Sequence, residues 1–155
     1  MIYGNVDGVK KYALDRLKKI YDMQVPKDVL CSREIVGIIW NFSIYLNREI
    51  SVAVDRRGEV VNVTIGNSST VDIGKFTSLE NRLSGIRIIH THPGSRARLS
   101  MVDVSALTKL KLDCIAAVGI KNGVIELCMG FCKIEDKLIK AEISNKITLD
   151  EGLQY

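Results

Sequence analysis

The sequence predicts an α/β fold in which helices flank a mixed β-sheet, and three observations lead to this prediction. Before residue 47, apolar residues recur every three or four positions, which is the period of an amphipathic helix. From residue 49 onward they alternate with small and polar residues, as they do in a half-buried strand. The run 114–120 is continuously small and apolar, which is typical of a strand covered on both faces.

The length and composition indicate one globular domain. The chain has 155 residues, of which 46% are apolar and 26% are charged, and this is enough for a proper core. We expect a single domain over 1–145 and a polar, linker-like tail over 146–155. No basic leader and no apolar run of membrane-spanning length is present, so we expect a cytoplasmic protein that contacts no membrane.

Charge and cysteine usage argue against two further classes of protein. The formal net charge is +4, but it comes without a dense block of Lys and Arg, so direct nucleic-acid binding is not expected. The chain has four cysteines and no C-x-x-C pair, which argues against a sulfur-rich zinc site and against a disulfide framework. The four are Cys31, Cys114, Cys128 and Cys132.

Two helices are predicted before the first strand. The first spans about 8–23, with Asp7 as its cap and a lysine-rich side as its solvated face. Its apolar positions are Val9, Ala13, Leu17 and Ile20. After a break at Pro26, the second helix runs from a Ser32 cap to about Leu46. Its apolar stripe consists of Ile35, Ile38, Ile39, Phe42, Tyr45 and Leu46, and Trp40 is expected in the core.

The remaining elements are mostly strands. A hairpin is predicted from strands 50–54 and 60–65, because Gly58 between them suits a tight turn. The predicted segments that follow are a loop 66–69, a short strand 70–73, a loop 74–84, a strand 85–90, a loop 93–99, a helix 100–111, a strand 114–120, its return arm 124–134 and a segment 137–143. Asn122-Gly123 is the strongest hairpin signal in the chain.

The only two histidines, His90 and His92, follow an apolar strand and lie one residue apart. Residues at this spacing project from the same face of a strand, so the two imidazoles are aimed at a common point. Asp103 follows eleven residues after His92. Two imidazoles and one carboxylate with an open fourth position are what a catalytic zinc site requires. The pattern has a second interpretation, in which Ser100 is a helix N-cap, Asp103 an acidic first-turn residue and the histidines ordinary polar residues.

The run from His90 to Asp103 resembles the signature of the JAMM (JAB1/MPN/Mov34) metalloproteases, which reads His-x-His-x7-Ser-x2-Asp. That signature includes an upstream glutamate at the start of a strand. Glu49, followed by 50–58 and 60–66, is similar to the corresponding segment of the RadC-like branch. Glu34 is the competing candidate, but it lies in a predicted helix and farther upstream, so Glu49 is preferred.

The resemblance implies a JAMM/cytidine-deaminase-like architecture and one bound Zn²⁺. His90, His92 and Asp103 would be its ligands. Glu49 would take a proton from water and pass it to the leaving amine, and Ser100 would hydrogen-bond the water or the oxyanion. The implied activity is hydrolysis of an amide or isopeptide bond in a peptide or protein substrate.

A second resemblance covers about 1–145. Here the chain is similar to the extra N-terminal region of long HflX-type GTPases, which associate with ribosomes. This similarity implies a ribosome contact made through a longer protein, since the chain itself has no phosphate-loop motif. It also implies an alternative function, that of a non-catalytic regulatory or interaction module of such a GTPase.

Overall fold

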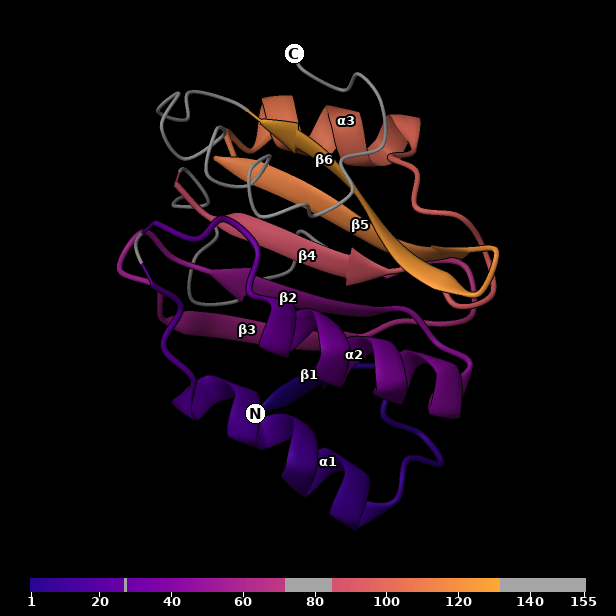
Figure 1. Ribbon diagram of the computed structural model, residues 1–155. Helices are drawn as coiled ribbons and strands as arrows, with labels where there is room; N and C mark the ends of the chain where they lie inside the picture. The colour runs from indigo at the N-terminus through magenta and orange to yellow at the C-terminus, as the bar shows by residue number, and fades with distance from the viewer. Residues whose placement is uncertain (27, 72–84, 132–155) are drawn as a thin grey trace.

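The computed structural model describes residues 1–26, 28–71 and 85–131, and it confirms the predicted α/β class. A six-stranded mixed sheet has the order β1-β3-β2-β4-β5-β6, and three helices pack against it (Figure 1). The elements are β1 (Ile2–Gly4), α1 (Lys11–Lys18), the 3₁₀ helix η1 (Lys19–Asp22), α2 (Arg33–Leu46), β2 (Ile50–Val54), β3 (Val60–Ile65), β4 (Arg87–Thr91), α3 (Met101–Lys109), β5 (Cys114–Lys121) and β6 (Val124–Phe131).

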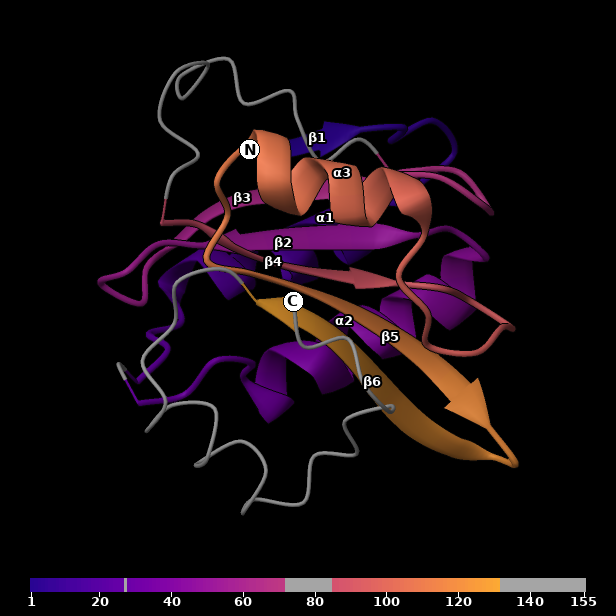
Figure 2. The ribbon, with the colours of Figure 1, turned by 90° about the horizontal axis from the view of Figure 1, so that it is seen from above.

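The sheet separates two layers of helix. α1 and α2 pack on one face over the larger apolar core, and α3 packs on the other face over a smaller one. Figure 2 shows α2 and α3 on opposite sides of the sheet. The central strand β2 runs antiparallel to β3 and to β4, while β4 runs parallel to β5. Successive residues of β2 and β4 therefore point alternately toward α2 and toward α3.

The N-terminal region differs from its prediction. The expected helix 8–23 is a shorter α1 followed by η1, and Asp7 does not cap it, since the N-cap is Lys10 and makes no side-chain cap. The reason is the backbone at Gly8, whose φ of +72° is incompatible with a first helical turn. The short strand β1 was not predicted, because three residues that pair only with β3 carry no periodic signal.

The second helix matches its prediction closely. Ser32 caps α2 by accepting a hydrogen bond from the N–H of Ile35 at 3.3 Å, and Trp40 lies in the core. The predicted apolar stripe is wrong at Tyr45, which is 56% exposed. The buried face instead continues along the helix to Ser43, which is a polar residue.

Two strand predictions and one helix prediction need correction. β4 begins at Arg87 rather than at residue 85, because Gly85 has a φ of +88° and lies in a turn. Thr70 and Val71 belong to no strand, and the carbonyl of Thr70 accepts a hydrogen bond from the N–H of Asn67. α3 ends at Lys109 rather than at 111, where the backbone turns to a φ of +56°. The predictions for 72–84, 132–134, 137–143 and the tail 146–155 fall outside the described residues.

Three of the four cysteines lie in the described part of the chain. Cys31, Cys114 and Cys128 are buried thiols. Cys132 lies outside the described part of the chain. Among the residues that the structure describes, no helix has the length and apolar character needed to cross a membrane.

Gly119 in β5 allows the loop between β4 and α3 to lie directly on the sheet. A Cβ at this position would be 2.1 Å from the backbone nitrogen of Ala97, well inside contact distance. The next residue, Ile120, donates its N–H to the carbonyl of Ser95 at 2.8 Å. Close backbone contact at a glycine therefore fixes the path of the chain from β4 to α3.

We expect Gly119→Ala to lower the free energy of unfolding by roughly 1–3 kcal/mol, because the loop backbone must move away from the added methyl group. Gly37→Ala in α2 is the matched control. A Cβ at Gly37 meets nothing within 4 Å, and alanine is favoured over glycine in a helix by roughly 0.5–1 kcal/mol. Urea unfolding measures both. Equal effects of the two substitutions would contradict this account of the loop.

Candidate metal centre

The two histidines come from the end of β4. His90 lies on the α3 side of the sheet, between Ser51 of β2 and Ala117 of β5 in the strand register, and is 1% exposed. His92 follows the last residue of β4, and its N–H donates to the carbonyl of Val118 at 2.7 Å. This bond extends the β4–β5 pairing by one step. It holds the second imidazole beside the first, as the spacing of the two residues predicts.

Asp103 comes from the first turn of α3, where it forms a capping box with Ser100. The Ser100 N–H and hydroxyl both donate to Asp103 Oδ2, at 2.7 and 2.8 Å, and the Asp103 N–H donates to Ser100 Oγ at 3.1 Å. The other carboxylate oxygen, Oδ1, faces His90 Nε2 at 3.4 Å. One carboxylate thus caps the helix with one oxygen and presents the second to the histidines.

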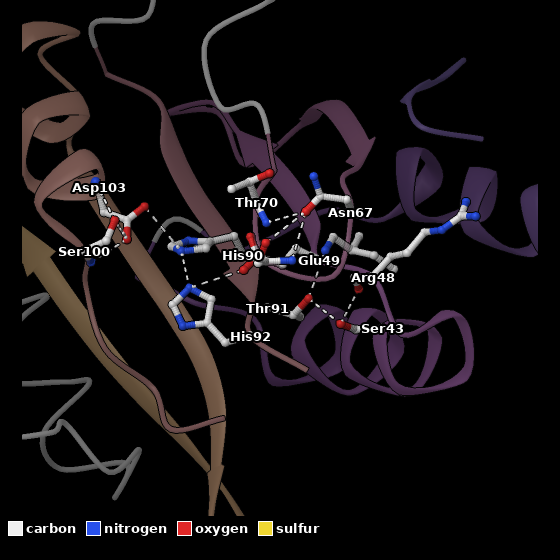
Figure 3. A network of polar contacts seen from close by, with 12 residues as sticks. Ser43, Arg48, Glu49, Asn67, Thr70, His90, Thr91, His92, Ser100 and Asp103 are labelled. Carbon is white, nitrogen blue, oxygen red and sulfur yellow. Dashed lines mark hydrogen bonds and ion pairs between the residues drawn. The ribbon is translucent and has the colours of Figure 1, made fainter. Parts of the chain in front are cut away.

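The three side chains converge on one point. His90 Nε2 and His92 Nε2 are 3.0 Å apart, and one potential ligand atom from each histidine and from Asp103 lies within 4.8 Å of the other two (Figure 3). Imidazole nitrogen and carboxylate oxygen are both ligands of divalent transition metals. This buried group can therefore hold a metal ion. The capping interpretation and the ligand interpretation of the sequence are compatible, because each uses a different oxygen of Asp103.

Glu49 is the fourth acidic or basic group at this point. It lies just before β2, is 7% exposed, and its Oε1 is 4.0 Å from His92 Nε2. Its main chain is held by the loop after β3, since its N–H donates to the carbonyl of Asn67 at 2.7 Å. The competing candidate Glu34 is exposed in the first turn of α2. Of the two glutamates, the structure brings Glu49 to the histidines.

Burial and mutual charge separate the pKa values of these groups. Burial raises the pKa of Glu49 to about 7, against an opposing effect of His90. Burial also lowers the pKa of His92, and the neighbouring His90 lowers it further. For Asp103, burial alone would raise the pKa, but hydrogen bonding and charge from His90 together with the Ser100 bonds lower it to about 2. Near neutral pH, Asp103 is ionised while Glu49 is close to its midpoint.

The loop after His92 is held by Glu126, whose Oε1 accepts from Arg96 Nε at 3.2 Å and from the Ala97 N–H at 3.1 Å. In the described part of the chain, Nδ1 of His90 is the one buried side-chain nitrogen or oxygen without a hydrogen-bond partner. A metal-bound histidine usually has such a partner. His90 does not meet this requirement.

These residues lie at the base of a cleft of about 750 Å³. One wall is apolar and consists of Val102 and Ala106 of α3 together with Leu110, the residue that follows the helix. The opposite rim is polar and consists of the loop Ser68–Thr70, which an Asn67 side chain braces by accepting from the N–H groups of Ser69 and Thr70. The volume falls within the usual range for small-molecule and cofactor sites.

Sequence reasoning singled out His90, His92, Asp103, Ser100 and Glu49, but it missed the polar residues behind them. Ser43 and Thr91 are both 0% exposed and hydrogen-bonded to each other, and neither was singled out. One signal was present. Ser43 follows Ile35 and Ile39 at four-residue spacing, so it places a hydroxyl on the buried face of α2. A polar residue in such a position needs a buried partner.

Comparisons with known proteins add no relative at this point. No protein-family model, no curated protein and no solved structure matched the chain. The function of the site is therefore inferred from its own side chains.

We expect Glu49→Gln to remove a pH dependence of stability in the metal-free protein. The pKa of Glu49 is raised from 4.5 to about 7 on folding, so its contribution to stability is complete below pH 4.5 and is lost as the pH rises to about 7. Over that window, the free energy of unfolding of the wild type should fall by roughly 1–3 kcal/mol relative to Glu49→Gln.

Urea unfolding in the presence of a chelator, at several pH values, measures this difference. Glu34→Gln is the control, because it removes an exposed carboxyl group from α2, outside the cluster, and should follow the wild-type curve. Parallel pH profiles for the wild type and Glu49→Gln would show that Glu49 is not buried in this way.

Proposed function

We propose that His90, His92 and Asp103 hold one zinc ion, and that the domain is a JAMM-like hydrolase that cleaves an amide or isopeptide bond. The observation that carries this proposal is the convergence of the two Nε2 atoms, 3.0 Å apart, with Asp103 Oδ1 in a cleft that also contains Glu49. Two imidazoles and one carboxylate leave a coordination position open, which is a feature of catalytic zinc sites.

The protonation states support this chemistry. When bound, zinc polarises a carbonyl group and acidifies water. Glu49, with a pKa of about 7, can accept a proton and return it to a leaving amine at neutral pH. The low pKa of Asp103 and the lowered pKa of His92 keep both side chains in the deprotonated forms that bind metal.

The JAMM resemblance implies that Ser100 hydrogen-bonds the water or the oxyanion, and this role requires a change in its hydrogen bonding. A hydroxyl has one proton, and the Ser100 hydroxyl donates it to Asp103 Oδ2 at 2.8 Å. To stabilise developing negative charge on a substrate, the hydroxyl must turn away from this bond. The helix cap does not depend on that proton, because the Ser100 N–H also donates to Oδ2.

A peptide or protein is the substrate class that we propose. The cleft sets an apolar wall on α3 against a polar rim at 68–70, with the candidate ligands and Glu49 at its base. A peptide segment offers both kinds of surface, in apolar side chains and in backbone amides that need hydrogen-bond partners.

A second candidate function is that of a non-catalytic module of an HflX-type GTPase, with a ribosome contact made through the longer protein. The complete capping box favours it, because Ser100 and Asp103 already have a structural role in starting α3. In this case the Ser-x-x-Asp pattern needs no catalytic explanation.

Hydrolysis by the zinc-loaded protein distinguishes the two candidates. A peptide library that includes lysine-branched isopeptides is incubated with the protein, and new amino termini are counted by mass spectrometry. The wild type should cleave. Glu49→Gln should cleave at least about 100-fold more slowly, because general acid–base catalysis is lost. Glu34→Gln should retain wild-type cleavage.

Two outcomes contradict the hydrolase. Cleavage that persists unchanged in Glu49→Gln assigns the activity to another group or to a contaminant. A zinc-loaded wild type that cleaves nothing in the library favours the non-catalytic module.

A further inference from the structure

A pair of buried hydroxyl groups lies behind the candidate metal centre, on the α2 side of the sheet. The Thr91 hydroxyl donates to Ser43 Oγ at 2.6 Å, and the Ser43 hydroxyl donates to the carbonyl of Arg48 at 2.6 Å. Both side chains are 0% exposed. Figure 3 shows them on the far side of the strand from the two imidazoles, next to the chain that carries Glu49.

The hydroxyl of Thr91 binds the main chain of β2 just beyond the last residue pair of β2 and β4. The register of β2 and β4 ends with Ser51 opposite His90, and one more step would place Ile50 opposite Thr91. There the Ile50 N–H donates to the Thr91 hydroxyl at 2.9 Å. A side chain of β4, rather than its main chain, thus holds the start of β2 next to the site.

The hydroxyl pair holds the residues on both sides of Glu49. Ser43 binds the carbonyl of Arg48, which precedes it, and Thr91 binds the N–H of Ile50, which follows it. The opposite edge of the same chain is held by the loop after β3, since the Gly66 N–H donates to the Glu49 carbonyl at 2.8 Å. The main chain at Glu49 is therefore fixed from both edges.

Thr91 also belongs to β4, the strand that carries the proposed ligand His90. Thr91 lies between His90 and His92, and alternation along the strand directs its side chain away from theirs. A displacement of the Thr91 hydroxyl therefore changes the distance between Glu49 and the histidines, which is 4.0 Å from Glu49 Oε1 to His92 Nε2. Ser43, Ile50 and Thr91 are each 0% exposed, so water cannot replace the bond from Ile50 to Thr91 or from Thr91 to Ser43 without rearrangement.

We propose that Ser43 and Thr91 are positioning residues, whose hydroxyl pair sets the placement of Glu49 relative to His90 and His92. The inference rests on the proposed function, in which Glu49 carries the proton. Neither hydroxyl faces the cleft, so both act through Glu49 and contact no substrate.

Three variants test this placement in the full chain. Thr91→Val keeps the β-branched shape and removes the hydroxyl, Thr91→Ser keeps the hydroxyl, and Ser43→Ala removes its partner. Thr108→Val is the matched control, because Thr108 is exposed and its hydroxyl donates within α3, to the carbonyls of Val104 at 3.2 Å and Ser105 at 3.1 Å. The probe is Co²⁺ alone, bound to ¹⁵N-labelled protein. The pseudocontact shift of the Glu49 amide reports the position of that amide relative to the metal.

We expect Thr91→Val to change the pseudocontact shift of Glu49 while that of Ala117, the β5 neighbour of His90, stays at its wild-type value. Thr91→Ser and Thr108→Val should preserve both shifts. Ser43→Ala should move the Glu49 shift in the same sense as Thr91→Val, and it keeps the test decisive if Thr91→Val does not fold. Peptide cleavage should fall roughly 10–100-fold in Thr91→Val and recover in Thr91→Ser.

The outcomes separate this inference from the proposed function. A wild-type protein that takes up no Co²⁺ overturns the metal centre, and this inference with it. A protein that binds Co²⁺ normally, with an unchanged Glu49 shift in Thr91→Val and in Ser43→Ala, overturns the positioning role alone. A Glu49 pseudocontact shift that changes in Thr91→Ser as much as in Thr91→Val would overturn the role of the hydroxyl, because the packing of the Thr91 side chain would then be what matters.

Discussion

The site depends on the alternation of side chains along β4. His90 points toward α3 and the cleft, while its neighbour Thr91 points toward α2 and binds Ser43. This alternation is a property of any extended strand, and it lets the end of one strand carry a candidate metal ligand on one face and a buried hydroxyl on the other. On the first face, His90 lies next to Asp103, which belongs to the cap of α3. On the second face, the Thr91 hydroxyl accepts from the N–H of Ile50, the residue after Glu49. The start of β2 and the start of α3, which are far apart in the sequence, are therefore both positioned by the end of β4.

The charges of the site are costly to bury, and the structure offsets this cost unequally. Asp103 is compensated by His90 and by the Ser100 bonds, so it stays ionised with a pKa of about 2. Glu49 has less compensation, and burial leaves it with a pKa of about 7. Two carboxyl groups in one cleft with widely separated pKa values suit two different tasks, a permanent anion that holds a cation and a group that exchanges a proton. The same burial makes the metal-free site a weak point in the stability of the fold.

Much of this structure could be predicted from local side-chain chemistry. Ser32 and Ser100 were predicted to cap helices because their hydroxyls bond within one turn, and both do. Prediction failed where backbone conformation decided, as at Gly8, since a glycine permits a positive φ but does not require it. The pair Ser43 and Thr91 is 48 residues apart and is created only by packing α2 on the sheet. The histidines and Asp103 lie close together in the sequence, whereas Glu49 was placed through a family resemblance.

The central claim is that His90, His92 and Asp103 together hold a metal ion. X-ray absorption at the zinc edge tests it most directly, on protein loaded with one equivalent of Zn²⁺. We predict a first shell of nitrogen and oxygen alone at about 2.0–2.2 Å, with the outer-shell scattering of two imidazole rings. In His92→Ala, the contribution of one ring should be lost. A sulfur shell at about 2.3 Å, or a zinc environment that is identical in the wild type and His92→Ala, would contradict the claim.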